Sequence, residues 1–274
     1  MQLHSKRKLN NGLLLPWLGF GVYKVSNADI VKSINWALEA GLRHIDTASV
    51  YGNEAGVGKA IKQSRIKREE LFITTKLWNE DMRAGRQKDA FERSLDELEL
   101  EQVDLYLIHW PVENFRESWK ILESIYASRR ARAIGVSNFQ IPHLEALLER
   151  SEVVPAVNQI ETHPYLTQYP LIEFCARRNI VCEAWGPLGG EGAPVLKDPV
   201  ITRLAETYGK TPAQIILRWN LQRNVVPLVK SVHKDRIVEN TRLFDFELSD
   251  KDIKAIDALN QDRRLGPDPD NFDF

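Results

Sequence analysis

Residues 103–109 read Val-Asp-Leu-Tyr-Leu-Ile-His, a short apolar run that ends in a polar side chain. A run of this length and composition is typical of a strand buried in a parallel sheet. Two similar runs, His44-Ile45-Asp46 and Leu71-Phe72-Ile73-Thr74-Thr75-Lys76, also end in titratable residues, and Tyr51 lies on the segment that leaves the first of them. Because the carboxyl ends of strands in a parallel barrel meet at one mouth, we expect four side chains to lie together there. They are Asp46, Tyr51, Lys76 and His109.

Strand-like and helix-like runs alternate along the chain. Eight strands are predicted, at Phe20–Val22, His44–Asp46, Phe72–Lys76, Val103–His109, Ala133–Val136, Val157–Ile160, Val181–Ala184 and Val225–Val229. Helices are predicted at Asn27–Ala40, Glu54–Lys62, Lys88–Leu98, Glu117–Ser128, Pro142–Arg150, Thr167–Arg178, Pro212–Gln222 and Lys234–Leu243. Eight buried parallel strands joined by right-handed helical crossovers close into a barrel. The predicted fold is therefore α/β, a (β/α)8 TIM barrel, with residues 1–274 as a single domain.

Three segments lie outside the repeating units. Asn10-Asn11-Gly12 supplies the residues of a tight turn between Leu3–Leu9 and Leu13–Leu15, which predicts an N-terminal β-hairpin. We expect this hairpin to plug the amino-terminal end of the barrel. Two extra helices are predicted at Pro199–Tyr208, which Gly209 ends, and at Asp250–Leu259, which Ser249 caps.

An open doubly wound sheet is the competing architecture. It would need a glycine fingerprint after the first strand. Gly19-Phe20-Gly21 is followed by Val22, Tyr23 and Lys24 instead of a third glycine that opens a helix. The next helix is predicted to begin only at Asn27, whose side chain would cap it. The barrel is therefore favoured.

The composition is that of an ordinary globular protein. A hydrophobic share of 43% allows a sizeable core, and 27% charged residues suit a soluble surface. The net charge of −1 argues against a dedicated polyanion binder, because such proteins carry a basic excess on one face. We interpret the densest basic cluster, Arg129-Arg130-Ala131-Arg132, as a solvated loop and expect no nucleic-acid partner.

Cysteine and histidine usage gives further expectations. The two cysteines, Cys175 and Cys182, do not form a disulfide framework, so a reducing compartment is expected.

The amino terminus has no apolar core after a basic segment, and no apolar run reaches the roughly 18 residues that cross a bilayer. We therefore expect a cytoplasmic protein with no membrane partner. No metal is predicted, because the remaining histidines lack the spacing of metal ligands. They are His4, His44, His143, His163 and His233.

The four residues at the mouth suit proton delivery. A free tyrosine titrates near about 10, and a cation within hydrogen-bonding reach stabilises the phenolate and lowers that pKa. We expect Lys76 to act on Tyr51 in this way, with Asp46 as the counter-ion that keeps the ammonium protonated. His109 would orient an incoming carbonyl oxygen or relay the proton.

Each of these residues has an ordinary structural explanation when it is taken alone. Asp46 can cap the next helix or brace a loop. A single histidine such as His109 is more often a satisfied core residue, and a lysine at a strand end such as Lys76 more often extends to solvent. The catalytic interpretation depends on four matching residue types at four separate places, three at strand ends and one on the segment after the first strand.

Long motifs around these residues resemble the aldo-keto reductase family. The segment Gly41–Glu54, which reads GLRHIDTASVYGNE, is similar to the first signature of the family. Phe72–Trp78 carries the family's lysine, and Leu105–Pro111 carries its histidine. The resemblance spans nearly the whole chain. It is strongest to the small bacterial and protozoan members, such as diketogluconate reductases and prostaglandin F synthase-like enzymes.

The resemblance implies an enzyme that reduces aldehydes and ketones to alcohols by hydride transfer from NADPH. Tyr51 would be the proton donor. Lys76 and Asp46 would tune that tyrosine, and His109 would position the substrate.

The resemblance also implies which residues bind the cofactor, NADPH or NADP+, without a Rossmann fold. Ser137, Asn138 and Gln159 match the ligands of the nicotinamide carboxamide, and Trp185 matches the aromatic residue that stacks on the ring. Gly186, Pro187, Leu188 and Gly189 match the loop along the pyrophosphate, and Lys230, Ser231, Val232, Arg236, Glu239 and Asn240 match the segment at the adenosine end. Gly21 and Val22 complete the expected contacts. Two cations and a hydroxyl, from Lys230, Arg236 and Ser231, suit the 2′-phosphate of NADPH better than the ribose diol of NADH.

Tyr23, Trp78 and Trp110 lie on loops beside the four residues and are expected to line the substrate pocket. An apolar pocket favours a broad range of small carbonyl substrates, namely aldehydes, α-dicarbonyls and keto sugars. We expect a monomer.

Two alternative functions stay open. A sensor that binds a dinucleotide with little turnover would not need the four intact residues, and an unrelated barrel enzyme would need a phosphate site or a metal cluster.

Overall fold

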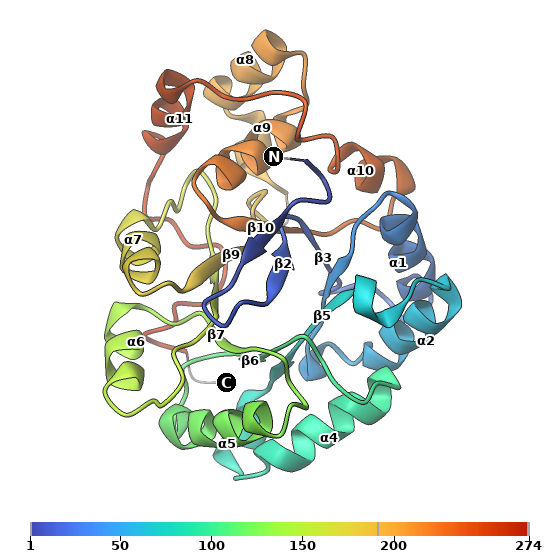
Figure 1. Ribbon diagram of the computed structural model, residues 1–274. Coiled ribbons are helices and arrows are strands. Elements are labelled where there is room, and N and C mark those ends of the chain that lie inside the picture. The colour runs from blue at the N-terminus through green and yellow to red at the C-terminus, as the bar shows by residue number, and fades with distance from the viewer. Residues whose placement is uncertain (1, 191, 273–274) are drawn as a thin grey trace.

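Eight parallel strands form a closed barrel in the computed structural model, which describes residues 2–190 and 192–272. The order around the barrel is β10-β3-β4-β5-β6-β7-β8-β9. The strands are β3 (Gly19–Gly21), β4 (His44–Asp46), β5 (Phe72–Leu77), β6 (Leu105–Ile108), β7 (Ile134–Ser137), β8 (Val157–Glu161), β9 (Val181–Trp185) and β10 (Val226–Val229). Figure 1 looks down this barrel and shows the helices as an outer ring. The predicted (β/α)8 fold is confirmed.

The helices of the outer ring follow the strands in chain order. They are α1 (Ile30–Glu39), α2 (Glu54–Ser64), α4 (Gln87–Leu98), α5 (Phe115–Ala127), α6 (Ile141–Leu148), α7 (Tyr169–Arg177), α9 (Pro212–Gln222) and α10 (Lys234–Glu239). The two extra helices are also present, as α8 (Pro199–Tyr208) and α11 (Asp250–Asp257). Their ends follow local chemistry, since Gly209 takes a left-handed φ of 59° after α8 and the Ser249 side chain accepts from the Asp252 N–H in α11.

Two local predictions need correction. Helix α1 begins at Ile30 with Asp29 at its N-cap, and the side chain of Ser26 accepts from the Asp29 N–H, so Asn27 is not the cap. A short helix, α3 (Asn79–Arg83), follows β5 directly and was not predicted. Five residues are too few for an apolar periodicity to show in the sequence.

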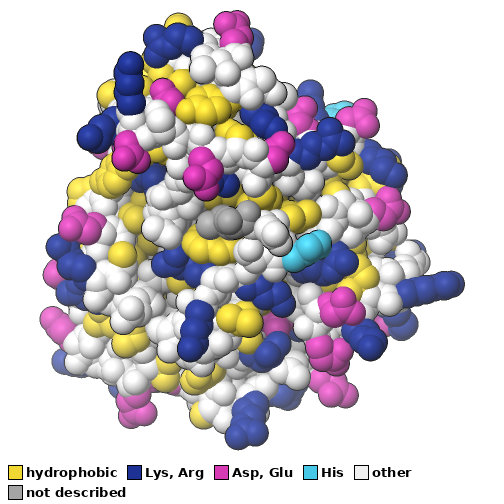
Figure 2. Space-filling view, turned by 45° about the horizontal axis from the view of Figure 1, so that its top comes forward, with side chains coloured by type: hydrophobic (Ala, Val, Ile, Leu, Met, Phe, Trp, Pro, Cys, Tyr) yellow, Lys and Arg dark blue, Asp and Glu magenta, His cyan; other side chains and the backbone are white. Residues whose placement is uncertain are grey.

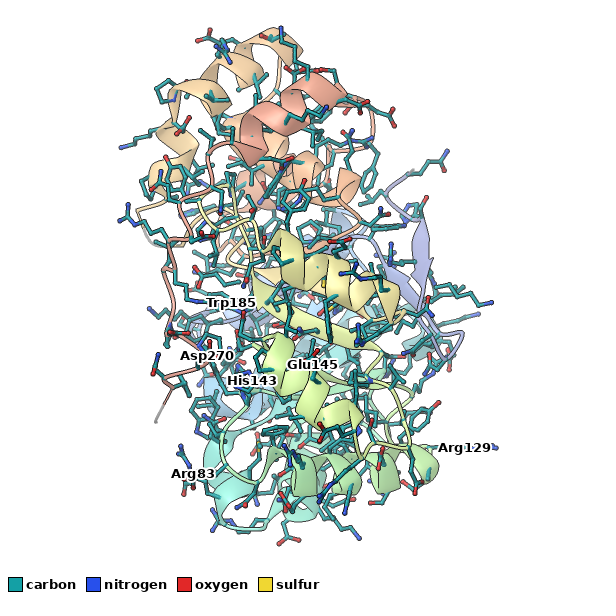
Figure 3. All side chains as sticks on the ribbon, turned by 90° about the vertical axis from the view of Figure 1, so that its left-hand side faces the viewer. Arg83, Arg129, His143, Glu145, Trp185 and Asp270 are labelled. Atoms are coloured by element: carbon teal, nitrogen blue, oxygen red, sulfur yellow. The ribbon has the colours of Figure 1, made fainter. Side chains whose placement is uncertain are left out.

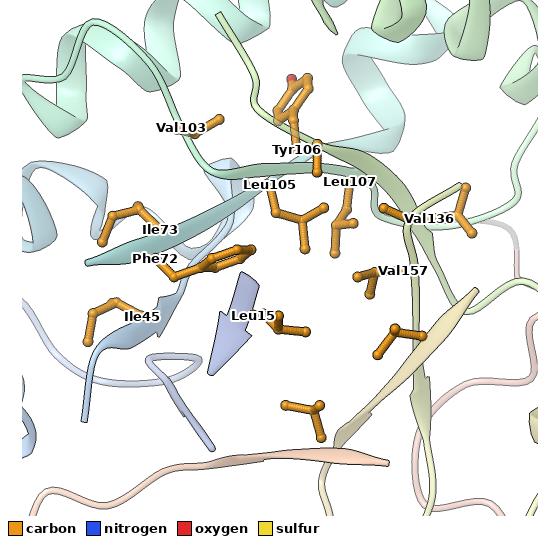
Figure 4. Close-up of a cluster of buried hydrophobic side chains, with 14 of the residues drawn as sticks. Leu15, Ile45, Phe72, Ile73, Val103, Leu105, Tyr106, Leu107, Val136 and Val157 are labelled. Atoms are coloured by element: carbon orange, nitrogen blue, oxygen red, sulfur yellow. The ribbon is translucent and has the colours of Figure 1, made fainter. Parts of the chain in front are cut away.

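The predicted hairpin closes the amino-terminal end of the barrel. Strands β1 (Lys6–Lys8) and β2 (Leu14–Pro16) pair antiparallel. The side chain of Asn11 donates to the Arg132 carbonyl just before β7. Leu15 is fully buried, and Figure 4 shows it among side chains of the barrel strands such as Phe72.

The interior of the barrel changes character along its length. Its amino-terminal half is filled by apolar side chains, as Figure 4 shows. Toward the carboxyl ends of the strands the buried side chains become polar and titratable. They are Asp46, Lys76, Gln159, Glu161 and Glu183. Such groups are costly to bury unless each finds a partner, so their contacts mark the site.

The outer surface has no large region of one charge on the face shown in Figure 2, where basic and acidic side chains are interspersed. A crevice of about 610 Å³ lies beneath the hairpin, lined by Leu14, Phe72 and Asp104 among others. It is at the end of the barrel away from the titratable side chains. Within its lining, Asp104 binds Arg132 at 2.7 Å.

Candidate active site

The four residues expected at the mouth of the barrel lie together. Asp46 ends β4, Lys76 lies in β5, His109 directly follows β6, and Tyr51 ends the 3-10 turn Ser49–Tyr51. The Lys76 Nζ atom lies 2.6 Å from Asp46 Oδ1 and 3.4 Å from the Tyr51 hydroxyl. The rings of Tyr51 and His109 meet edge to face, with their centroids 5.7 Å apart.

Local sequence holds Tyr51 in this place. Gly52 takes a φ of 62° and ends the turn that carries the tyrosine. The Ser49 hydroxyl donates to the Lys76 carbonyl at 3.1 Å, and the Thr47 carbonyl accepts from Lys76 Nζ at 2.9 Å. The loop after β4 is therefore fastened to β5 by both the backbone and the side chain of the lysine.

Lys76 is a fully buried ammonium group, with no exposed surface. Burial alone would lower its pKa, but the Asp46 carboxylate and the Tyr51 hydroxyl outweigh burial and raise the pKa above the ordinary value. The lysine therefore stays charged at neutral pH.

Tyr51 departs from the expectation of a lowered pKa. Burial raises the pKa of its phenol, and the Lys76 charge opposes that shift without reversing it. The predicted direction of the lysine effect is right and the predicted net shift is wrong, because the sequence does not reveal how deeply the hydroxyl is buried. The resting tyrosine is therefore a neutral phenol that still carries its proton.

His109 is a neutral imidazole. Burial and the Lys76 charge lower its pKa well below the ordinary range. Its Nδ1 atom is buried and has no hydrogen-bond partner among the described residues. Because Nδ1 is buried, Nε2 is the ring nitrogen that a ligand can reach. Its backbone carbonyl accepts from the Asn138 side chain at 3.0 Å.

Aromatic side chains surround these groups. The Tyr23 ring lies 5.0 Å from that of Tyr51, and the Trp78 ring lies 5.2 Å from that of His109. Tyr23 is 56% exposed, as expected for a residue at the rim of the mouth. Trp110 is buried, because Phe272 stacks on it in parallel at 3.9 Å. Phe272 is a further wall residue that the sequence could not place, since it lies far along the chain from the strands.

The residues expected at the nicotinamide end form a continuous polar network. The Asn138 amide nitrogen lies 3.0 Å from the His109 carbonyl and 3.1 Å from Ser137 Oγ. Asn138 Oδ1 accepts from Trp185 Nε1 at 2.7 Å. The Gln159 amide nitrogen donates to Asp46 Oδ2 at 2.8 Å. A carboxamide that binds here therefore meets groups whose orientation is already fixed.

The residues expected at the adenosine end divide into two groups. Lys230, which follows β10, and Arg236, in α10, are exposed, and neither forms an ion pair within the part of the chain that the structure describes. Ser231 and Asn240 are buried. Glu239 is already engaged, since it accepts from the Thr211 hydroxyl at 2.8 Å. Two unpaired cations beside the mouth suit a phosphate group.

The glycine-containing loop after β9 holds the other expected cofactor residues. Gly186 and Gly189 take φ values of 58° and 83°, which other residues rarely adopt. No atom lies within 4 Å of the position that a Gly186 Cβ would occupy, so this part of the loop faces open space. Pro187 and Leu188 lie between the two glycines. Beyond β10 in the barrel order, Gly21 ends β3 and Val22 follows it, and Val22 is fully buried.

Sequence reasoning missed the carboxyl group of Glu183 inside the barrel. Glu183 is fully buried in β9, and its Oε2 atom accepts from the Gln159 amide nitrogen at 3.0 Å. Burial and the neighbouring Asp46 carboxylate raise its pKa to about 8. Its other oxygen lies 3.9 Å from Nδ1 of His44, whose pKa burial lowers to about 3. The signal that could have found Glu183 is a charged residue inside an otherwise apolar predicted strand.

Some kinds of site are absent from the part of the chain that the structure describes. No cluster of three or more histidine, cysteine, aspartate or glutamate side chains that could hold a metal ion occurs among the described residues. No helix in residues 2–190 and 192–272 has the length and apolar character needed to cross a membrane. Cys175 and Cys182 are both free thiols.

Comparison with known proteins assigns the chain to a family. The model of the Aldo/keto reductase family matches residues 17–261. The chain is 50% identical to the glyoxal reductase of Bacillus subtilis, over 97% of each chain. It is 46% identical to the methylglyoxal reductase DkgA of Salmonella typhimurium, also over 97% of each.

A solved structure shows the same fold. An aldo-keto reductase from a Medee basin deep-sea metagenome library superposes with a TM-score of 0.96 at 40% identity, and the match covers 98% of this chain and 100% of the other. The architecture is that of a barrel oxidoreductase. The chain belongs to the aldo/keto reductase family.

Proposed function

We propose that this reductase uses NADPH to reduce small aldehydes, ketones and α-dicarbonyls to alcohols, with Tyr51 as the proton donor. The observation that carries the proposal is the placement of Lys76 Nζ between Asp46 Oδ1 and the Tyr51 hydroxyl, with the ring of His109 edge to face against that of Tyr51. Relatives named glyoxal reductase and methylglyoxal reductase support the α-dicarbonyl class.

The residues at the mouth fit a nicotinamide dinucleotide. Trp185 offers a partly exposed indole, and Gln159 offers its carbonyl oxygen, because its amide nitrogen is held by two carboxyl groups. Lys230 and Arg236 would hold the 2′-phosphate, since both cations lack a carboxylate partner among the described residues. When bound, the reduced nicotinamide supplies a hydride to the carbonyl carbon of the substrate.

Tyr51 supplies the proton. Its phenol is neutral at rest, so it holds the proton that the substrate oxygen needs as negative charge develops on that oxygen. The phenolate that remains lies 3.4 Å from the Lys76 ammonium, which stabilises it. Asp46 keeps that ammonium charged and in place.

His109 positions the substrate. A neutral imidazole can donate a hydrogen bond from Nε2 to the carbonyl oxygen without competing as an acid. The rings of Tyr23 and Trp78 bound the space above this group. Aromatic walls with few polar groups accept many small carbonyl compounds and select weakly among them.

Turnover tests the proposal. Purified protein should consume NADPH in the presence of methylglyoxal or an aromatic aldehyde, and should do so as a monomer, because one chain supplies every group named above. We also expect it to act in the cytoplasm. If the protein binds NADPH but oxidises none of it across a broad panel of carbonyl compounds, the sensor alternative replaces this proposal.

A further inference from the structure

The segment after α11, residues 258–272, runs along the β6–β9 side of the mouth without forming a helix or strand, and we call it the tail. Its far end is anchored at two points. Phe272 stacks on Trp110, and the Asp270 carboxylate lies 3.6 Å from His143 Nε2 at the start of α6. Figure 3 shows His143 and Asp270 side by side.

A buried carboxylate holds the middle of the tail. Glu161 ends β8 and is 1% exposed. Its Oε1 atom accepts from the backbone N–H of Leu265 at 2.7 Å, and its Oε2 atom accepts from that of Gly266 at 3.1 Å. His163 Nε2 lies 3.0 Å from Oε1. A buried carboxylate is costly unless it is well bonded, and the tail supplies two of the three bonds of this one.

The same point of the tail rests against an expected cofactor residue. A Cβ atom on Gly266 would lie 2.4 Å from Cη2 of Trp185, so only a glycine backbone can approach the indole this closely. The nitrogen of that indole donates to Asn138 Oδ1 at 2.7 Å. The indole is therefore held on one edge by Asn138 and on another by the tail.

Leu265 extends the contact to the next loop. Its Cδ1 atom lies 3.6 Å from the position that a Cβ on Gly190 would occupy, and 3.9 Å from the corresponding position on Gly189. The tail thus packs on the indole and on the glycine loop together. Both elements belong to the proposed cofactor site.

We propose that Glu161 is a positioning residue. Its two hydrogen bonds to the backbone of Leu265 and Gly266, which we call the latch, hold the tail at the mouth. The tail, held in this way, fixes the Trp185 indole in the orientation that receives the nicotinamide ring. This inference rests on the proposed function, because the ring is part of NADPH. It explains why a buried carboxylate faces two backbone N–H groups of the tail, and why glycine stands at the point where the tail meets the indole.

The latch itself is tested without cofactor. Glu161→Gln keeps the size of the side chain but replaces one acceptor oxygen with an NH2 group, so at least one bond to the tail is lost. Hydrogen exchange at the amides of Leu265 and Gly266 should become about tenfold faster or more, since a hydrogen bond to a charged group is worth roughly a power of ten. The matched control is Glu145→Gln, an exposed carboxylate of α6 labelled in Figure 3, which should leave this exchange unchanged.

The link to the cofactor is tested by comparing two ligands. Glu161→Gln should weaken NADPH binding by about tenfold while leaving 2′,5′-ADP binding unchanged, because that analogue lacks the nicotinamide ring. Gly266→Ala should do the same with Glu161 intact, because the added methyl group displaces the indole.

Two results would overturn the proposal. Unchanged exchange at Leu265 and Gly266 in Glu161→Gln refutes the latch. Faster exchange with unchanged NADPH affinity in both Glu161→Gln and Gly266→Ala refutes the link to Trp185. A wild-type protein that binds neither NADPH nor 2′,5′-ADP contradicts the proposed function instead, and the exchange measurement then still decides whether Glu161 holds the tail.

Discussion

Lys76 Nζ lies 2.6 Å from Asp46 Oδ1 in a part of the barrel where neither side chain has more than a trace of exposed surface. Either charge alone would be strongly destabilising at this depth. The pair is tolerated because the Thr47 carbonyl accepts a second bond from the ammonium and the Gln159 amide donates to the other carboxylate oxygen. The proposed proton-delivery site is thus a fully bonded ion pair with one hydroxyl at its edge.

Removal of the Lys76 ammonium group should destabilise the folded protein. Lys76→Met leaves Asp46 as a buried charge without its partner, so we expect a loss of about 3–5 kcal/mol in the free energy of unfolding together with loss of reduction. Urea denaturation measures the first effect and NADPH oxidation the second.

A second substitution separates the two effects. Asp46→Asn in the Lys76→Met background should restore part of the stability and none of the activity. A Lys76→Met protein that is as stable as the wild type would show that Asp46 finds another partner, contrary to the contacts described above.

Glu183 should make stability depend on pH. Its pKa is about 8 in the folded chain against an ordinary value of 4.5, so between these values the folded state keeps a proton that the unfolded state has released. The stability that this proton contributes is fully present below pH about 4.5 and is lost as the pH rises through about 8. Between these pH values the free energy of unfolding changes by about 1.4 kcal/mol per pH unit, which amounts to a few kcal/mol.

The measurement is the free energy of unfolding at pH about 5 and about 8 for wild type and Glu183→Gln. The glutamine variant should lose less stability over this range, because it cannot ionise. Glu145→Gln, on the surface, should follow the wild type. Parallel pH profiles for all three proteins would mean that Glu183 is ionised throughout.

Much of the fold and of the mouth could be predicted from the sequence. The strand β4 occupies His44–Asp46, as predicted. It is buried over its whole length, as is typical of a strand in a parallel sheet. Asp46, Tyr51, Lys76 and His109 converge because strand ends in a barrel share one edge. That argument needs only the position of each residue in its own unit.

Contacts between distant units could not be predicted. Glu161 binds the backbone of Leu265 and Gly266, more than a hundred residues later, and no pattern in either segment indicates the other. Glu183 meets His44 across the interior of the barrel for the same reason. The net pKa shift of Tyr51 also escaped prediction, because it depends on burial that all the neighbouring units create together.

Cofactor preference should depend on Arg236. Arg236→Ala removes an exposed cation without a carboxylate partner among the described residues, so it should weaken NADPH by about 10- to 100-fold and NADH far less, in line with the loss of a charge-assisted hydrogen bond. Fluorescence titration with each cofactor measures this. Arg150→Ala, an exposed arginine after α6, is the control and should bind both as the wild type does. Equal losses for NADPH and NADH in Arg236→Ala would mean that this side chain does not contact the 2′-phosphate.

The most direct test of the account is the Tyr51→Phe variant, assayed for both NADPH binding and methylglyoxal reduction. The substitution removes one hydroxyl and keeps the ring that packs against Tyr23 and His109. Since a general acid contributes about 10²- to 10⁴-fold, kcat/KM should fall by about that factor while the Kd for NADPH stays at the wild-type value. Reduction at the wild-type rate by Tyr51→Phe would contradict the role of this tyrosine as the proton donor.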